Sequence, residues 1–156
     1  MDQAMVEAAE DPAVPMYLTF NLGPEVYGLP LERVLEIIGM QPITPIPETP
    51  PHVRGVINLR GKVIPVIDVR SRFRLELRPY DPRTCIIVVQ TGGWSVGLVV
   101  DTVSDVVAIS VEATEPPPPA TESTGEHYLH GVGKVGDGVR LLLDVDRFLG
   151  PSLPRA

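Results

Sequence analysis

The chain has 156 residues and a formal net charge of −7, and hydrophobic residues make up 44% of it while aromatic residues make up only 5%. This length suffices for one ordinary domain or two small ones, and the aliphatic content predicts a packed core rather than disorder. The acidic balance argues against general nucleic-acid binding. No apolar run is long enough to cross a bilayer, and the acidic N-terminus lacks the basic region of a secretory signal.

A single cysteine, Cys85, excludes an intrachain disulfide and favours a cytoplasmic location. Charge is distributed unevenly, because residues 54–83 carry eight basic and three acidic side chains within an otherwise acidic molecule. The simplest interpretation of this segment is solvated surface, and the alternative is a docking face that steers an acidic partner. Residues 1–14 and 151–156 are expected to form loose tails.

Strands are the main elements that the sequence predicts. Residues 16–22 and 26–31 form an expected hairpin around the Gly-Pro-Glu turn, and residues 85–101 form another around Gly92-Gly93. Residues 60–69 and 137–145 are further apolar strands. Short helical turns are predicted over residues 30–37, 68–73 and 144–150, the last ended by Gly150 and Pro151.

An internal repeat organises these elements. Two offsets relate the copies, so that Gly28 matches Gly97 at 69 residues, while Gly55 matches Gly131 and Asp68 matches Asp144 at 76 residues. The extra length falls in the Pro-rich residues 112–127. Each copy is too small for a strong core of its own, and a short bent sheet loses its edges by closing into a barrel. We therefore predict an all-β fold, with one barrel in residues 15–80, another in residues 81–150, and a groove between them.

Residues that could support chemistry are few. His127 and His130 are three apart but have no nearby cysteine, and His52 is far from them in sequence, so surface positions are favoured over a metal site. Cys85 opens an apolar strand and is interpreted as a packed hydrophobe rather than a nucleophile. Neither a metal nor a cofactor is predicted.

The paired acids Asp68 and Asp144 have two interpretations. Twin carboxylates perform acid–base chemistry when they share a cleft. Each of these two, however, ends a strand before a short helical turn, which favours N-capping.

The stretch "GVINLRGKVIPVID", residues 55–68, also has two interpretations. Its glycines could cradle a phosphate, but no Gly-Lys-Ser/Thr and no long helix follow, so a barrel hairpin turning at Gly61 is favoured. Arg60 does not recur in the second copy, where Gly136 stands. Its guanidinium is predicted to pair with the Glu36 carboxylate.

Four segments carry a family likeness: "YLTFNLGPEVYGLPLERVLEI", "HVRGVINLRGKVIPVIDVRSRF", "VGLVVDTVSDVV" and "HYLHGVGKVGDGVRLLLDVDRFL". From about Met16 to Leu149 the chain resembles the CheW-type chemotaxis coupling proteins, and "GVINLRGKVIPVIDVR" is the most specific part. The resemblance implies two tandem SH3-like five-stranded β-barrels with a few short helices. The same fold ends the histidine kinase CheA, and the absence of kinase segments here implies a stand-alone adaptor.

The function implied by this resemblance is a non-enzymatic adaptor that couples chemoreceptors to CheA. Its implied partners are the cytoplasmic hairpin tip of the receptors, the regulatory domain of CheA, and other CheW-like domains in arrays. Such an adaptor is cytoplasmic, is recruited to membrane receptor clusters, and needs no cofactor, nucleic acid or membrane insertion. One alternative is a CheW-like adaptor of a non-flagellar pathway, such as surface motility. Another is a small enzyme using Asp68 and Asp144.

The resemblance also assigns residues to surfaces. The implied receptor-binding residues are Leu18, Leu31, Val34, Glu36, Ile37, Arg60, Cys85, Val103 and Val106. The implied kinase-binding residues are Ile43, Arg54 and Val63. A ring-forming contact is expected near residues 115–120, where "EPPPPA" lacks the basic and aromatic residues expected there. Fold roles in turns and caps are predicted for Gly55, Gly61, Asp68, Gly97, Gly131 and Asp144.

Overall fold

The computed structural model describes residues 13–117 and 128–150, which fold almost entirely as strands. Contacts divide the chain into two units. Unit 1 contains the chain up to Glu32 together with Val103–Phe148, and unit 2 contains Arg33–Thr102 together with the chain from Leu149. Each unit is built on one sheet. The expected tails, residues 1–14 and 151–156, lie almost wholly outside the described residues.

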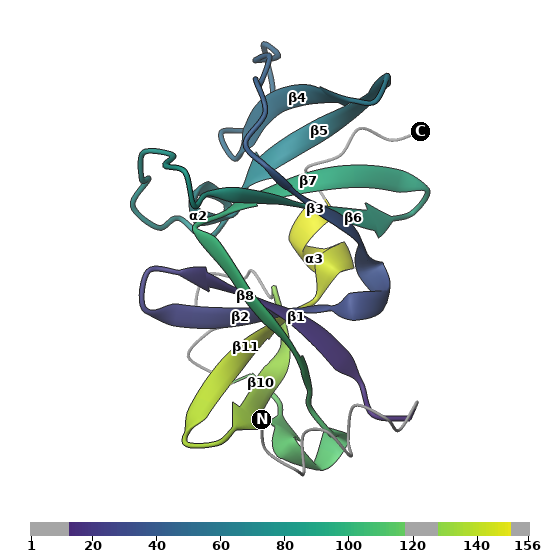
Figure 1. The fold of residues 1–156 in the computed structure, drawn as a ribbon, viewed down its shortest axis with the longest axis vertical. Coiled ribbons are helices and arrows are strands. Elements are labelled where there is room, and N and C mark those ends of the chain that lie inside the picture. The colour runs from purple at the N-terminus through teal and green to yellow at the C-terminus, as the bar shows by residue number, and fades with distance from the viewer. Residues whose placement is uncertain (1–12, 118–127, 151–156) are drawn as a thin grey trace. The chain divides into compact units, whose positions relative to one another are not determined.

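The sheet of unit 1 has six strands in the order β8-β1-β2-β11-β10-β9. In chain order they are β1 (Met16–Leu22), β2 (Glu25–Pro30), β8 (Thr102–Ala108), β9 (Thr114–Glu115), β10 (Leu129–Val135) and β11 (Gly138–Leu143). Strands β1 and β2 form an antiparallel hairpin, as predicted, and β2 then pairs in parallel with β11. Figure 1 shows this meeting of purple and yellow-green segments, which are far apart in the sequence.

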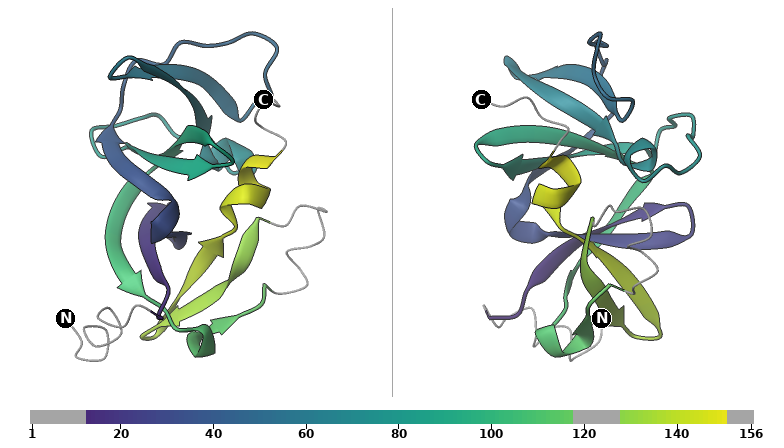
Figure 2. Two further views of the ribbon diagram at one scale, coloured as in Figure 1. Left: turned by 90° about the vertical axis from the view of Figure 1, so that its right-hand side faces the viewer. Right: turned by 180° about the vertical axis from the view of Figure 1, so that it is seen from behind.

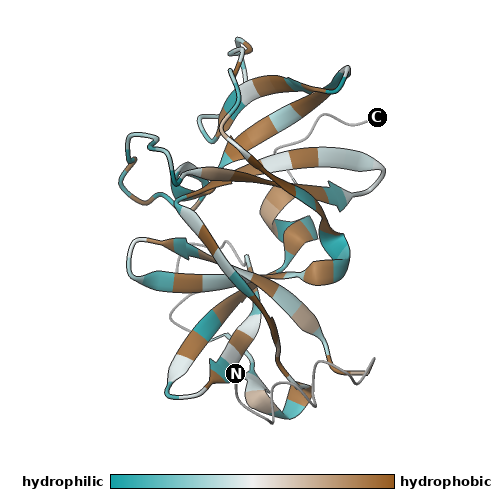
Figure 3. Ribbon diagram, in the orientation of Figure 1, coloured by the Kyte–Doolittle hydropathy of each residue, from teal (hydrophilic) through white to brown (hydrophobic). Residues whose placement is uncertain are grey.

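Unit 1 is held by a small apolar core. Tyr17, Val107, Ile109 and Leu142 form one buried cluster. The rings of Phe20 and Tyr27 stack with centroids 5.5 Å apart. Hydropathy alternates along the strands (Figure 3), as expected where one face of each strand is buried. A 3-10 turn, η2 (Val111–Ala113), and a helix, α3 (Val145–Leu149), also begin in this unit.

The sheet of unit 2 has five strands in the order β3-β6-β7-β5-β4. They are β3 (Val34–Gly39), β4 (Val53–Leu59), β5 (Lys62–Asp68), β6 (Cys85–Thr91) and β7 (Trp94–Val100). Hairpins β4–β5 and β6–β7 are antiparallel, and β5 pairs in parallel with β7. Figure 2 shows both hairpins from two further sides, with the short helix α2 (Val69–Arg72) following β5.

The core of unit 2 is aliphatic. Six buried side chains from β4, β5, β6 and β7 form one cluster, against which Ile38, Met40, Ile43 and Leu59 pack. Burial of each such side chain contributes about 1.5–3 kcal/mol. The buried members are Ile57, Ile64, Val66, Ile86, Val88 and Val99. These β-branched residues suit a pleated, closely packed sheet.

The repeat is present in the structure and extends to individual hydrogen bonds. The amide of Asp68 donates to the carbonyl of His52 at 2.9 Å, and the amide of Asp144 donates to the carbonyl of Tyr128 at 2.8 Å. Gly55 and Gly131 both follow register irregularities in their strands. These equivalences show that Asp68 and Asp144, and likewise Gly55 and Gly131, have equivalent positions in the two copies, as the sequence predicted.

The two units differ from the sequential barrels expected over residues 15–80 and 81–150. Hairpin β1–β2 of the first copy joins the sheet of β8–β11, and hairpin β6–β7 of the second copy joins the sheet of β3–β5. The parallel pairs β2–β11 and β5–β7 join the copies in each unit. Because the repeated hairpins present similar edges, the repeat alone does not determine which copy each hairpin joins. The chain therefore exchanges hairpins between copies.

The helical turn predicted over residues 30–37 is confirmed only at its start. A 3-10 turn, η1 (Leu31–Arg33), occurs there, but β3 follows at once and pairs with β6. Tertiary strand pairing overrides the weak local helix preference of these residues. The other two predicted helical segments are confirmed as α2 and α3.

Candidate functional site

The tip of hairpin β4–β5 has an unusual backbone. Arg60 and Gly61 form its two-residue turn with φ angles of 52° and 86°, which is the pattern of a type I′ turn. The Asn58 side-chain oxygen accepts a 2.8 Å hydrogen bond from the Gly61 amide. In hairpin β6–β7 of the same sheet, two glycines, Gly92 and Gly93, form the turn, with φ angles of 51° and 83°. Arg60 thus keeps a large side chain in a left-handed conformation that L-residues adopt at a cost.

The Arg60 guanidinium forms an ion pair with the Glu36 carboxylate, as predicted. Glu36 lies on β3, an edge strand of the same sheet. The hydrogen bond to Glu36 and the charge of its carboxylate raise the pKa of Arg60. The Arg60 side chain is 69% exposed and that of Glu36 is 32% exposed. An ion pair this open to solvent adds little to folding, so its position suits recognition better than stability.

Strand β3 also exposes apolar side chains, which alternate with Glu36 along the strand and so point to its other face. Leu35 is 50% exposed and Ile37 is 44% exposed, while Val34 is half-buried. Cys85, half-buried on β6, lies opposite Gly39 of β3. Five of the nine predicted receptor residues, including Arg60, therefore belong to unit 2.

The remaining predicted receptor residues belong to unit 1. Val106 is 43% exposed on edge strand β8, and Val103 and Leu31 are half-buried. Leu18, in contrast, is only 4% exposed on β1. Leu18 is thus a core residue in this structure and is not available for direct contact with a partner.

Asp105 of β8 is the repeat equivalent of Glu36, but it has a different partner. The Thr19 hydroxyl accepts from the Asp105 amide at 3.0 Å and lies 2.5 Å from its carboxylate, to which it can donate. This contact ties Asp105 to its own sheet. The Glu36 carboxylate instead meets a guanidinium at a hairpin tip, so the two edge strands differ in the charge pattern that they present.

The predicted kinase residues lie on and beside hairpin β4–β5. Val63 is 64% exposed, and Arg54 is exposed at the register irregularity of β4. Ile43 is half-buried and packs against the core of unit 2. Arg54 and Val63 are therefore accessible to a partner, whereas Ile43 contributes mainly to packing.

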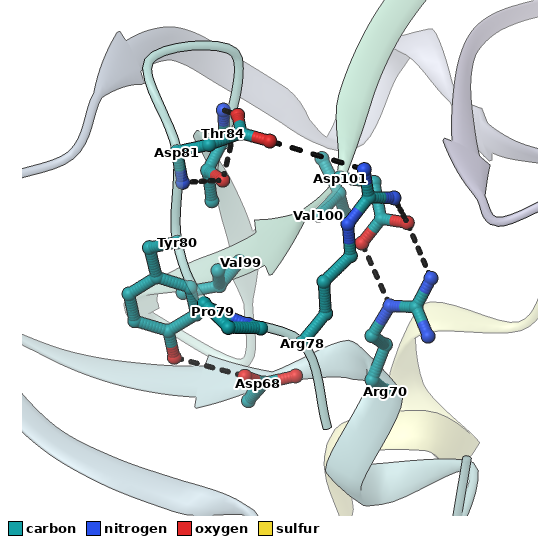
Figure 4. Close-up of a pocket in the computed structure, with 10 residues that line it drawn as sticks. All are labelled: Asp68, Arg70, Arg78, Pro79, Tyr80, Asp81, Thr84, Val99, Val100 and Asp101. Atoms are coloured by element: carbon teal, nitrogen blue, oxygen red, sulfur yellow. Dashed lines mark hydrogen bonds and ion pairs between the residues drawn. The ribbon is translucent and has the colours of Figure 1, made fainter. Parts of the chain in front are cut away.

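A second charged cluster, which the sequence did not indicate, surrounds Asp101 (Figure 4). Arg70 contacts this carboxylate with two nitrogens at 2.8 and 2.5 Å, and Arg78 contacts it at 2.9 Å. The hydrogen bond to Asp101 raises the pKa of Arg70. The density of arginines in residues 70–78 was the available signal, but nothing in the sequence indicated which acid they meet.

The Asp68 carboxylate has two structural roles. One oxygen accepts from the Ser71 amide at 3.3 Å and caps α2, and the other accepts from the Tyr80 hydroxyl at 2.8 Å. Burial, then the bond to Asp68, raises the pKa of Tyr80 to about 12. Asp144 accepts from the Arg147 amide at 3.1 Å in the equivalent cap. The predicted capping roles of Asp68 and Asp144 are therefore confirmed, and both carboxylates are engaged.

The glycines with predicted fold roles meet different constraints. Gly55 has a φ of 143°, and a side chain there would meet the Thr44 carbonyl at 2.1 Å. A Cβ at Gly131 would lie 2.9 Å from the Glu115 carbonyl. Gly61 has open space around it but needs its positive φ.

The described residues hold no group of three or more His, Cys, Asp or Glu side chains that could bind a metal ion. His130 is exposed on β10, and His127 lies outside the described residues. The thiol of Cys85 lies 3.2 Å from the Arg83 carbonyl. Within the described ranges, no helix is long and apolar enough to cross a membrane.

The predicted ring-contact segment is described only up to residue 117. Glu115 forms an ion pair with Lys134 at 2.8 Å. Residues 118–120 lie outside the described residues, so that part of the expectation stays a prediction.

A β-sheet module with an exposed apolar edge strand and a charged hairpin tip is the architecture of a protein-binding domain. Comparison with known proteins defines the family: the CheW-like domain matches residues 16–151, and this chain belongs to that family. It is a CheW-type chemosensory adaptor with two SH3-like barrels.

Several relatives support this assignment. The chain is 39% identical over 133 residues to the chemotaxis protein CheW of Klebsiella aerogenes, covering 85% of this chain and 80% of that one. It is 33% identical over 141 residues to protein FrzA of Myxococcus xanthus, covering 90% and 88%. The scaffolding protein TtCheW of Thermoanaerobacter tengcongensis has a solved structure that matches with a TM-score of 0.77 and 38% identity, covering 84% of this chain and 89% of that one. Members of this family are scaffolds and adaptors, which points to a non-enzymatic role.

Proposed function

We propose that this protein couples chemoreceptors to the histidine kinase CheA by binding both. The observation that carries the proposal is the Arg60–Glu36 ion pair on an edge strand, β3, that also exposes Leu35 and Ile37 on its other face. The chain retains Arg60 where the equivalent turn of the repeat, in unit 1, has Gly136, so the side chain has a use that outweighs its backbone cost.

The receptor side of the proposed coupling uses β3. Leu35 and Ile37 offer an apolar anchor for the helical hairpin tip of a receptor. The Arg60–Glu36 pair on the same strand fixes the register of the partner, because rim charges contribute more to specificity than to affinity. We propose that Val103 and Val106 contact the same receptor.

The kinase side of the proposed coupling uses hairpin β4–β5. Val63 supplies exposed apolar surface and Arg54 supplies charge. An adaptor that holds receptor and kinase together lets a change in receptor conformation bias the kinase, provided that the two receptor states bind differently. Such coupling would recruit the adaptor to receptor clusters and requires no chemistry from the adaptor itself.

A second candidate function keeps the adaptor role but changes the pathway. The similarity to FrzA covers 90% of the chain, and FrzA belongs to a non-flagellar pathway. The same surfaces would then couple a motility-system receptor to its kinase. Exchange of receptor and kinase fragments between the two kinds of pathway in the assay below distinguishes the candidates.

The test is direct binding of the full chain to receptor hairpin fragments and to the CheA regulatory domain. Arg60→Asn suits the turn, since asparagine tolerates positive φ, and it removes the ion pair with Glu36. Lys62→Asn is the matched control, because Lys62 lies on the same hairpin and contacts Ser95 rather than Glu36. We expect Arg60→Asn to weaken receptor binding by about tenfold and to leave kinase binding unchanged. A folded wild-type chain that binds neither partner overturns the proposed function.

A further inference from the structure

The connection between α2 and β6, residues 73–84, forms a long loop of defined conformation. It has no strand or helix of its own, and loops of this length within a compact unit are commonly functional. The Arg70 side chain donates to the Glu76 carbonyl at 2.9 Å, and the Leu75 amide donates to the Arg70 carbonyl at 2.8 Å. These bonds fix the first half of the loop to the end of α2.

The second half of the loop is fixed by side chains (Figure 4). Arg78 binds Asp101, and the Tyr80 hydroxyl donates to Asp68. Asp81 accepts from the Arg83 amide at 2.7 Å and from the Thr84 amide at 3.2 Å. The loop is therefore preorganised, and a partner that binds it pays little ordering entropy.

This ordered loop nevertheless exposes large apolar side chains. Leu75 is 41% exposed, Leu77 is 55% exposed and Tyr80 is 38% exposed. Leu77 and Tyr80 border a hollow of about 150 Å³, several times what one water molecule needs. The lining residues are Arg54, Asp68, Leu77, Arg78, Pro79 and Tyr80.

Of the charged side chains around this hollow, Arg54 is the cation that a partner can bind. Both oxygens of Asp68 are engaged, by the α2 cap and by Tyr80. Arg78 is bound to Asp101. Arg54 lines the hollow with Tyr80, and among the described residues no ion pair joins Arg54 to a carboxylate. The hollow thus combines an apolar wall with an arginine that lacks an acidic partner, within the most basic segment of an acidic chain.

We propose that this hollow receives a carboxylate side chain of the kinase, with an apolar neighbour of that carboxylate packed against Leu77 and Tyr80. The inference rests on the proposed function and specifies the chemistry of the kinase surface. Arg54 belongs both to the predicted kinase contact and to the hollow, so the kinase footprint extends from hairpin β4–β5 onto residues 77–80. A guanidinium fits a carboxylate in a bidentate geometry, which accounts for the choice of an acid over other polar groups.

The test measures the affinity of the full chain for the regulatory domain of the CheA kinase of the same organism. Arg54→Glu should weaken binding at least tenfold, because it places two carboxylates together. Arg83→Glu is the matched control: Arg83 is exposed in the same basic segment but does not line the hollow. We expect it to change affinity less than about twofold, because Arg83 is outside the hollow and the charge of an exposed side chain is screened by solvent and salt.

A second variant tests the apolar half of the hollow. Leu77→Asn should weaken kinase binding severalfold without affecting folding, because this side chain is 55% exposed. Kinase binding that survives both Arg54→Glu and Leu77→Asn overturns this inference and leaves the proposed function intact. Loss of receptor binding instead of kinase binding in these variants also overturns it. Failure of the wild-type chain to bind the kinase overturns the proposed function, and this inference with it.

Discussion

Arg60 adopts a left-handed backbone conformation, with a φ of 52°, that asparagine occupies at lower cost. Its ion pair with Glu36 is open to solvent and adds little stability in return. We therefore predict that Arg60→Asn leaves the melting temperature unchanged or raises it by up to about 3 °C, although it weakens receptor binding. Thermal unfolding followed by circular dichroism measures this. A decrease of more than about 5 °C would show that the ion pair supports folding.

Tyr80 gives a prediction for alkaline pH. Its pKa is raised from 10.0 to about 12, mainly by burial and then by the bond to Asp68. Between these two pKa values, the Tyr80 hydroxyl has lost its proton in the unfolded chain but keeps it in the folded chain. The free energy of unfolding therefore falls as pH rises from about 10 to about 12. Tyr80→Phe should lower the unfolding free energy at neutral pH by about 1 kcal/mol, because the hydrogen bond is lost.

The same variant should lose stability less steeply above pH 10, since phenylalanine has no proton to release. Denaturant unfolding of both proteins at pH 7, 10 and 11.5 tests this difference. The pKa of Tyr17 is also raised by burial, and because Tyr17 is present in both proteins, its contribution cancels in the comparison. Parallel stability curves would exclude Tyr80 as the source of the alkaline loss.

Some single-residue contacts could be predicted from the sequence and others could not. The Arg60–Glu36 pair was predicted from the exposed turn position of Arg60 and from the family resemblance. The Asp101 cluster did not, because its arginines come from α2 and the loop after it, and no periodic pattern connects them to β7. Leu18 was assigned to a partner surface by resemblance, but at 4% exposure it belongs to the core.

Among the elements, strand β7 depends on a glycine at a close approach. A Cβ at Gly97 would lie 2.8 Å from the Ile86 side chain. Gly97→Asp adds a carboxylate as well as this clash, and we expect a loss of about 3–5 kcal/mol in unfolding free energy. Gly39→Asp is the matched control, since Gly39 is exposed and nothing lies within 4 Å of its added Cβ. Similar melting temperatures for both variants would contradict the packing role of Gly97.

Hairpins were the elements that the sequence predicted best. Gly92-Gly93 and Gly23-Pro24 turns flanked by alternating strands define β6–β7 and β1–β2 without any tertiary information. Strand β3 was mistaken for a helical turn, because residues 30–37 have apolar spacing compatible with either structure. Its pairing with β6, about 50 residues away, decides the outcome, and a local pattern does not contain that contact.

At the scale of the whole molecule, the exchange of hairpins between copies means that each sheet needs strands from both copies in order to form. The first sequence copy contains β1–β2, whose sheet partners β8 and β11 lie in the second copy. The repeat predicted two similar sheets correctly. It could not assign the hairpins, because equivalent hairpins have equivalent edges and only the parallel contacts β2–β11 and β5–β7 distinguish the two arrangements.

This arrangement predicts how fragments of the chain behave. Residues 33–102 contain all five strands of the unit 2 sheet and its aliphatic cluster, so we expect this fragment to fold, with low stability because it is small. Residues 15–80 have almost the same length but contain β1–β2 without their sheet partners and β3–β5 without β6–β7. Unpaired strand edges and an incomplete core should leave this second fragment unfolded. Amide dispersion in two-dimensional NMR spectra distinguishes these states. A dispersed spectrum for residues 15–80 together with a collapsed one for residues 33–102 would favour sequential barrels instead of exchanged hairpins.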